Sequence, residues 1–226
     1  RDKFLSQMIN GSLNLQNIEA TFPAVWLQRQ PAFPIVKIYE KTSWSCHHGI
    51  QRWGGVCECT PHSDWKKHFR DAMNQISDLL DQVYMGEMQD IFSDVWQARD
   101  RYIEVMLGEK DFQSWLRENT QAALTPQEET RVRHLLDAQV ESQKMFTSCG
   151  WFFDDLDRIE PRNNLVCAAH AMWLTRLASG IDLMEKVIPA LEKILSWQTG
   201  INGAQIFRDA YHRFSEISKA TVSIPE

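Results

Sequence analysis

Apolar side chains recur at a spacing of three or four positions over most of the chain, a pattern that predicts amphipathic helices packed into a bundle. Ser63 precedes the first of these stripes, and we expect it to cap the N-terminus of that helix. A second stripe follows Gly86, and three more fill the C-terminal third of the chain. The stripe positions are Trp65, Phe69, Ala72, Ile76, Leu80 and Val83; Phe92, Val95, Trp96, Tyr102, Ile103 and Met106; Leu165, Ala168, Met172 and Leu177; Met184, Val187, Leu191 and Ile194; and Phe207, Ala210, Phe214 and Ile217. The predicted fold class is therefore mainly α, a helical bundle.

The start of one further helix can be predicted in detail. Thr125 stands at a capping position, Pro126 follows at the first helical position, and Glu128 comes three residues after the cap. This combination is the sequence signature of a capping box, and it predicts a helix that runs to Phe146.

One short segment has the composition of a β-strand. Residues Ile35–Tyr39 are rich in β-branched side chains and follow the proline-marked connector Gln30–Pro34. An isolated strand leaves its backbone groups without partners, so its sheet must come from outside the chain, from the weaker Phe22–Trp26 stretch or from another subunit. We therefore divide the chain into residues 1–40, a connector or the end of a preceding domain, and residues 41–226, the helical bundle domain.

Composition and charge restrict the partners that we expect. The chain has 226 residues, of which 43% are hydrophobic, enough to bury a sizeable core. Its 24 basic and 30 acidic residues form no block of like charge, so we expect no nucleic-acid partner. Without a long apolar run or a signal-peptide pattern, we expect no membrane partner and a cytoplasmic location. The odd number of cysteines, five in all, favours reduced thiols over a disulfide framework.

Two segments interrupt the helical pattern and carry reactive or ligand-binding residue types. The first, residues 41–59, is a long loop that leaves the carboxyl end of the predicted strand and contains Trp, Cys, His and Arg. The second, residues 145–155, places Gly150 and three aromatic residues ahead of Asp154 and Asp155. Polar groups in broken elements need partners when they are buried, so we expect the two segments to meet in space.

The same two segments carry a resemblance to a known family. The first reads Thr-Ser-Trp-Ser-Cys-His-His-Gly-Ile-Gln-Arg-Trp over residues 42–53 and ends in Cys57-Glu58-Cys59; the second reads Met-Phe-Thr-Ser-Cys-Gly-Trp-Phe-Phe-Asp-Asp over residues 145–155. In these motifs the chain resembles family fifty-seven glycoside hydrolases, in a branch whose C-terminal domain follows an α-amylase- or α-mannosidase-like barrel. The resemblance spans about Pro34 to Ala178, and His47 stands where the branch commonly has a small residue.

The resemblance implies the C-terminal part of a larger barrel-plus-bundle protein, in which residues 1–40 are the end of an α/β barrel or a connector. Its implied partners are an α-linked oligo- or polysaccharide and an upstream catalytic barrel, in the same polypeptide or a companion chain. The bundle would close the substrate cleft, and the family's catalytic Glu and Asp lie on earlier barrel strands, so no residue of this chain is expected to be catalytic and no cofactor is required. The implied substrate-binding residues are Trp44, His48, Arg52, Trp53, Trp151, Asp154 and Asp155.

The cysteines support a different hypothesis, a metal site. Thiolate and imidazole are ligands that zinc prefers, and Cys46, Cys57, Cys59 and Cys149, with His48 nearby, offer enough of them for a zinc or iron ion. The Cys-X-Cys spacing is tighter than the usual two-residue spacer, and the cysteines could instead be small buried apolar residues. Three functions therefore stay open: the cleft-closing part of a glycoside hydrolase, a non-catalytic carbohydrate-binding or interaction domain, and a metal- or thiol-dependent protein.

Overall fold

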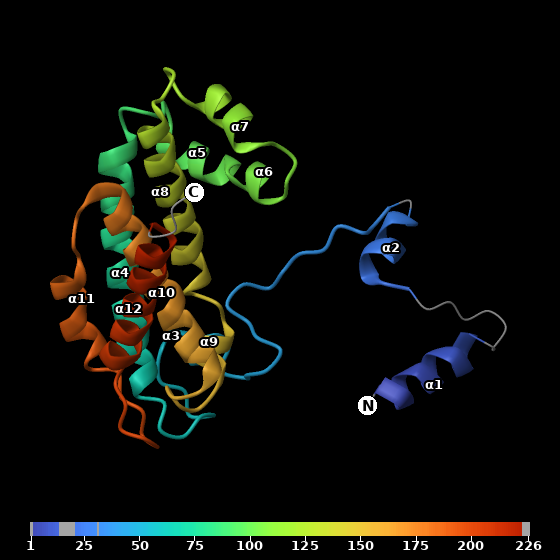
Figure 1. Cartoon of the computed structure of the whole chain (residues 1–226). Helices are drawn as coiled ribbons and strands as arrows, with labels where there is room; N and C mark the ends of the chain where they lie inside the picture. Colours follow the sequence, from blue (N-terminus) through green and yellow to red (C-terminus); the bar gives the residue numbers. More distant parts are fainter. Residues whose placement is uncertain (1, 14–20, 31, 223–226) are drawn as a thin grey trace. The chain divides into compact units, whose positions relative to one another are not determined.

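The computed structural model describes residues 2–13, 21–30 and 32–222, and within them the only extended regular structure is a pair of isolated bridges, Phe92 with Thr120 and Leu195 with Asn202. The chain divides into two compact units, Arg1–Glu40 and Lys41–Glu226. The first unit contains α1 (Asp2–Leu13) and α2 (Pro23–Gln28), and the second contains all the other helices (Figure 1). The boundary coincides with the division expected from the sequence, and the role of the first unit as a barrel end or connector stays a prediction.

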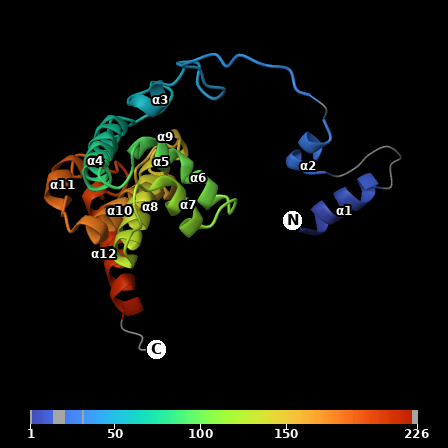
Figure 2. The same ribbon diagram turned by 90° about the horizontal axis from the view of Figure 1, so that it is seen from above.

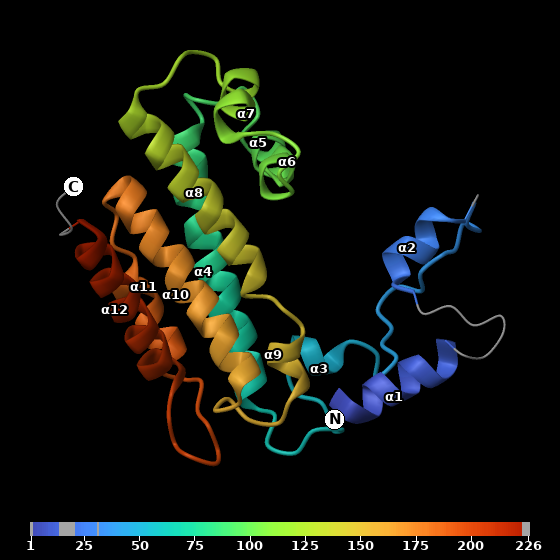
Figure 3. The same ribbon diagram turned by 45° about the vertical axis from the view of Figure 1, so that its right-hand side comes forward.

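Long helices form the second unit because their apolar stripes face one another. The central helix, α10 (Ile159–Ser179), packs against α8 (Pro126–Lys144), α12 (Gly203–Val222) and α4 (Trp65–Met88), while α11 (Met184–Leu191) covers α4 (Figure 3). The stripe residues Phe69, Ile76 and Leu80 of α4 are fully buried, as are Leu165 and Ala168 of α10. Burial of this apolar surface is the main force that holds the bundle together.

Short helices lie toward the two ends of this bundle. At one end, α5 (Val95–Arg101), α6 (Ile103–Met106) and α7 (Phe112–Asn119) connect α4 to α8, and toward the other lie α3 (Gln51–Gly54) and α9 (Cys149–Phe152) (Figures 1 and 2). The stripe from Phe92 to Met106 predicted one helix, whereas the structure breaks it at Tyr102.

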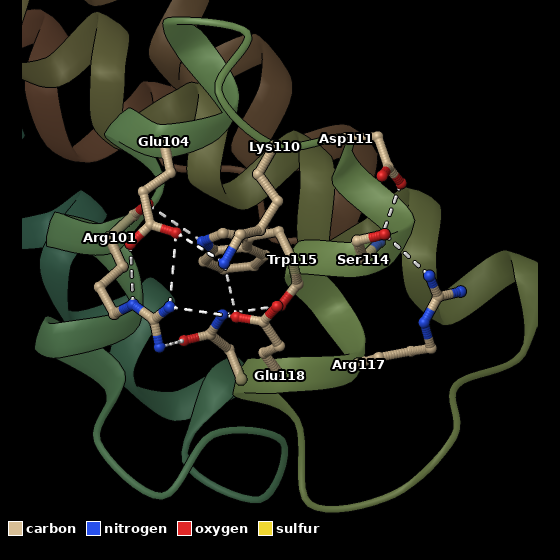
Figure 4. A network of polar contacts seen from close by, with 9 residues as sticks. Arg101, Glu104, Lys110, Asp111, Ser114, Trp115, Arg117 and Glu118 are labelled. Carbon is tan, nitrogen blue, oxygen red and sulfur yellow. Dashed lines mark hydrogen bonds and ion pairs between the residues drawn. The ribbon is translucent and has the colours of Figure 1, made fainter.

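Ion pairs connect the short helices α5, α6 and α7 (Figure 4). Arg101 pairs with Glu104 at 3.0 Å, and Lys110 bridges Glu104 at 3.1 Å and Glu118 at 2.6 Å. The indole nitrogen of the buried Trp115 donates to the carbonyl oxygen of Arg101 at 3.0 Å beneath this network. Since partly exposed ion pairs contribute little individually, we assign the network to local structure and not to a binding site.

The capping box at the start of α8 is confirmed. The Thr125 side chain accepts a hydrogen bond from the backbone of Glu128, and the Glu128 carboxylate accepts one from the backbone of Thr125. The cap predicted for α4 is wrong, because Asp64 occupies that position without a side-chain bond and the Ser63 hydroxyl bonds the backbone of Cys57 instead.

The predicted strand is also wrong. Residues 35–39 are extended but pair with no strand in the described part of the chain, and Ile35, Val36 and Ile38 are at least three-quarters exposed. The stretch suggested as a partner, Phe22–Trp26, is instead the start of α2, which Pro23 opens. A β-branched composition alone cannot form a strand, because the ladder hydrogen bonds require a second strand.

A candidate metal centre in the loop before α4

Three thiols and one imidazole converge in the loop between residues 41 and 62. One ligand-type atom from each of Cys46, His48, Cys57 and Cys59 lies within 4.8 Å of the others. The Sγ atom of Cys46 is 3.6 Å from that of Cys57 and 3.7 Å from that of Cys59, and the His48 Nδ1 atom is 3.1 Å from the Cys59 Sγ atom and 3.6 Å from the Cys57 Sγ atom. This cluster could hold a metal ion, as the sequence predicted for its cysteines.

The backbone around the cluster is folded by specific contacts. Gly49 has a φ of +69°, and a Cβ atom there would lie 2.6 Å from the carbonyl oxygen of Lys41, so only glycine fits this close turn. The Gly49 amide donates to the Cys46 carbonyl oxygen at 3.1 Å, which places Cys46 and His48 on one side of the turn. On the other arm, the buried Ser63 hydroxyl accepts from the Cys57 amide at 3.2 Å, and the Thr60 amide donates to the Cys57 carbonyl oxygen at 2.9 Å. The first part of the loop thus contributes Cys46 and His48 to the cluster, and the second part contributes Cys57 and Cys59.

The thiols differ in accessibility and in proton affinity. Cys46 and Cys57 are buried, whereas Cys59 is partly exposed. Burial alone would raise the pKa of the Cys46 thiol, but hydrogen bonds from the His48 backbone and from the neighbouring thiols outweigh it and lower this pKa to about 7. Burial, together with bonds to Cys46 and Cys57 and their charges, raises the pKa of Cys59 to about 11. The Cys46 thiol can therefore ionise near neutral pH, whereas the Cys59 thiol keeps its proton there unless a cation displaces it.

The imidazole of His48 points its second nitrogen outward. Its Nε2 atom lies 3.9 Å from a carboxylate oxygen of Glu58, whose side chain is exposed. Glu58 lies on the side of the imidazole where a metal-bound histidine commonly has a carboxylate partner, but the separation exceeds hydrogen-bond distance, so Glu58 does not fix the tautomer in this structure.

The loop is fastened to the bundle by the second predicted segment. The Trp53 indole nitrogen donates to the Ser148 carbonyl oxygen at 3.0 Å, the Arg52 guanidinium carbon lies 4.9 Å from the centre of the Phe152 ring, and Arg70 of α4 donates to the Trp53 carbonyl oxygen at 2.9 Å. The two motif-bearing segments, about a hundred residues apart in sequence, therefore meet as predicted.

Other predicted site residues lie elsewhere. Cys149 is exposed and does not belong to the four-residue cluster, so its expected place as a ligand is wrong. Trp44 is 96% exposed, whereas Trp151 is fully buried against Phe69 and under the Arg70 guanidinium group. A buried indole cannot stack on a sugar ring in this structure, so Trp151 is a core residue here.

Asp155 has a structural role, and the backbone of Asp154 contributes to the same region. The buried Asp155 carboxylate accepts hydrogen bonds from the Ser196 hydroxyl at 2.8 Å, the Trp197 amide at 3.0 Å and the Asp157 amide at 3.0 Å. The Asp154 carbonyl oxygen accepts from the indole nitrogens of Trp65 and Trp197, both at 3.2 Å. These bonds anchor the loop between α11 and α12 to the end of the bundle.

Sequence reasoning missed two buried residues beside the cluster. Ser63 was interpreted as a helix cap, and only its bonds to Cys57 reveal its role. Lys66 is fully buried in the first turn of α4. The sequence could have indicated the burial of Lys66, because Lys66 lies three residues before Phe69 and therefore on the apolar face of a predicted helix.

The fold and the cluster define an α-helical protein with a candidate metal centre in its N-terminal loop. The chain belongs to the family described as "Domain of unknown function (DUF3536)", which it matches over residues 62–222. The four candidate ligands lie just before the matched residues. No curated protein and no solved structure matches the chain. No helix in the described ranges has both the length and the apolar character that a membrane span requires.

The structural role of Asp155 predicts the effect of replacing it. In Asp155→Asn the amide nitrogen must face a hydrogen-bond donor, since three donors surround the carboxylate. We expect the free energy of unfolding to fall by roughly 1–3 kcal/mol, measured by chemical denaturation. Asp71→Asn is the control, because Asp71 is exposed on α4, and it should change stability less. Wild-type stability of Asp155→Asn would contradict this assignment.

Proposed function

We propose that the chain is a zinc-binding helical domain in which Cys46, His48, Cys57 and Cys59 hold one Zn²⁺ ion. The observation that carries the proposal is the spacing of the four ligand atoms. Zinc–sulfur distances of about 2.3 Å and zinc–nitrogen distances of about 2.0–2.1 Å in a tetrahedron separate sulfur atoms by about 3.8 Å and sulfur from nitrogen by about 3.5 Å. The two Cys46 sulfur–sulfur separations, 3.6 and 3.7 Å, fit these values. The His48 Nδ1 atom lies 3.1, 3.6 and 3.9 Å from the Cys59, Cys57 and Cys46 sulfur atoms, a range that brackets the tetrahedral sulfur–nitrogen separation.

The ligand set favours a structural ion over a catalytic one. Four protein ligands complete a tetrahedron and leave no position for water or substrate, whereas catalytic zinc keeps one position open. Two of the ligands, Cys46 and Cys57, are also buried. Three thiolates further favour zinc over magnesium or calcium, which prefer oxygen ligands.

The ion would order the loop and, through it, the surface of the bundle. Between residues 41 and 62 the only regular element is the single turn of α3, so the loop has little secondary structure to stabilise it. A metal that joins Cys46 and His48 to Cys57 and Cys59 closes the loop around α3 and so positions Arg52 and Trp53 against α9. The free energy of metal binding then contributes to the free energy of folding of this segment.

Metal content tests the proposal directly. Protein purified without a chelator and without an affinity-tag metal should contain about one equivalent of zinc by elemental analysis, and Cys57→Ser should lose most of it. Cys149→Ser is the matched control, since Cys149 is exposed and outside the cluster, and it should keep the zinc. Less than about a tenth of an equivalent of any transition metal in the wild-type protein would overturn the proposal.

Zinc affinity should fall as the pH falls. Protons compete with the metal for thiolates, and the pKa values of about 11 for Cys59 and about 7 for Cys46 mean that both thiols bind protons below pH 7. We expect the apparent affinity to drop by at least about tenfold between pH 7 and pH 6, more steeply than above pH 8, in competition titrations with a chromophoric chelator. An affinity that is constant over this range would exclude thiolate ligands.

A second function is proposed from the contact between the two motif-bearing segments. We propose that the bundle closes the substrate cleft of a barrel-plus-bundle protein that acts on α-linked sugars, as the family fifty-seven resemblance implies. The contact between Trp53 and Ser148 supports it, because the segments that carry the resemblance form one surface. Of the two tryptophans in the first segment, Trp44 is almost fully exposed and Trp53 is partly exposed, whereas Trp151 of the second segment is buried.

Carbohydrate binding would distinguish this second function. The chain should bind a soluble α-glucan weakly without hydrolysing it, because the family's catalytic carboxylates are on barrel strands. Trp44→Ala should weaken retardation in an α-glucan gel. Trp26→Ala should not, because it removes a half-exposed indole that belongs to the first unit. Equal retardation of both variants and the wild-type protein would remove Trp44 from the site.

A further inference from the structure

Lys66 is an unusual residue in this structure. Its side chain is fully buried, and its Nζ atom has no hydrogen-bond partner in the described part of the chain. The centre of the Trp65 ring lies 5.8 Å from Nζ. An unpaired buried ammonium group costs several kcal/mol unless a negative charge compensates it, roughly as for any desolvated ion.

The charges around Lys66 are unbalanced when the thiols are protonated. Arg52 acts on it as a like charge, while Cys57 and Asp154 act on it as negative groups when ionised. Burial, reinforced by Arg52, lowers the pKa of Lys66 to about 8. The backbone joins Lys66 to the cluster: the Lys66 amide donates to the Ser63 carbonyl oxygen at 3.0 Å, and the Ser63 hydroxyl accepts from the Cys57 amide at 3.2 Å. Negative charge at the cluster can therefore compensate this buried cation.

A loaded metal centre supplies that missing negative charge. A divalent ion bound by three thiolates and one neutral imidazole carries one net negative charge. We propose that Lys66, a buried and unpaired positive charge whose backbone is joined to Cys57 through Ser63, is the counter-cation of the metal centre and stabilises the bound divalent ion and its thiolates. This inference rests on the proposed zinc site, and it assigns a positioning role to a residue that binds no metal itself.

The counter-cation also affects which ions the centre prefers. A trivalent ion with the same ligands would be neutral, so Lys66 would add nothing to its binding. A divalent ion gains the full interaction with Lys66, which is strong in a buried environment. The proposal therefore predicts selectivity for divalent ions such as Zn²⁺ and Co²⁺ over trivalent ions of similar size.

Replacement of Lys66 by methionine tests the inference in the full chain. Lys66→Met keeps an unbranched side chain but removes the charge, and Lys67→Met, at the exposed neighbouring position, is the matched control. Competition titration with a chromophoric chelator should show zinc affinity about tenfold or more lower in Lys66→Met and unchanged in Lys67→Met. Cobalt-loaded Lys66→Met should retain the thiolate charge-transfer absorption of the wild-type protein, showing that the ligands are intact.

Thermal unfolding of the metal-free proteins separates this role from a purely structural one. Without metal, Lys66→Met should unfold at the same temperature as the wild-type protein or higher, because an unpaired buried amine has been removed. Lys66→Gln, which is also uncharged, serves as a second variant and should weaken zinc binding similarly.

Three outcomes would overturn the inference. Zinc affinity of both uncharged variants equal to that of the wild-type protein would show that the charge has no role. Loss of metal-free stability in proportion to the loss of zinc affinity, or failure of both uncharged variants to fold, would make Lys66 a structural residue only. A wild-type protein that binds no zinc would overturn the metal site and the role of Lys66 together, which distinguishes that failure from the other two.

Discussion

The confinement of three thiols and an imidazole within 4.8 Å of one another constrains the whole N-terminal side of the bundle. Three thiolates at this separation would repel one another strongly, so they must share protons or bind a cation. Hydrogen bonds within the cluster lower the pKa of Cys46 to about 7, whereas burial, together with the bonds and charges of Cys46 and Cys57, raises the pKa of Cys59 to about 11. A divalent ion relieves this repulsion and joins both arms of the loop.

The bundle provides the rigid surface on which this loop is held. The first turns of α4 carry Trp65 and Phe69 into the core, and the same turns join Lys66 to Cys57 through hydrogen bonds of Ser63. Across the junction, Gly150 of α9 lies so close to Asn164 of α10 that a Cβ atom would be 2.3 Å from the Asn164 amide nitrogen. The contact allows Asn164 to donate to the Thr147 carbonyl oxygen at 3.0 Å and fixes the segment that receives Trp53. Packing thus determines where the loop can lie, and the metal would determine its shape.

Local patterns in the sequence predict the regular part of the fold well. The stripe beginning at Trp65 and the capping box at Thr125 correspond to α4 and α8, because periodicity and capping depend on residues that are near in sequence. The strand at residues 35–39 fails, since strand formation depends on a partner that the segment itself does not specify.

The residue types of the candidate site could be predicted from the sequence, but the exact set of residues that meet there could not. Cys46, Cys57 and Cys59 could be grouped from their residue types, whereas the absence of Cys149 from the cluster depends on which side of α9 faces the loop. Likewise, the motif around Trp151 identifies the contacting segment, but tertiary packing places that indole in the core and leaves Trp44 exposed. Burial of Asp155 depends on Ser196 and Trp197, which lie about forty residues away and carry no local signal.

X-ray absorption at the zinc edge tests the central claim most directly, because it measures the ligand atoms around the metal in the wild-type protein as purified. A centre formed by Cys46, His48, Cys57 and Cys59 predicts a four-coordinate ion with three sulfur atoms at about 2.3 Å and one nitrogen atom at about 2.0–2.1 Å. A first shell of nitrogen and oxygen atoms without sulfur would show that any zinc present is bound elsewhere, and would contradict the assignment of this loop as the metal centre.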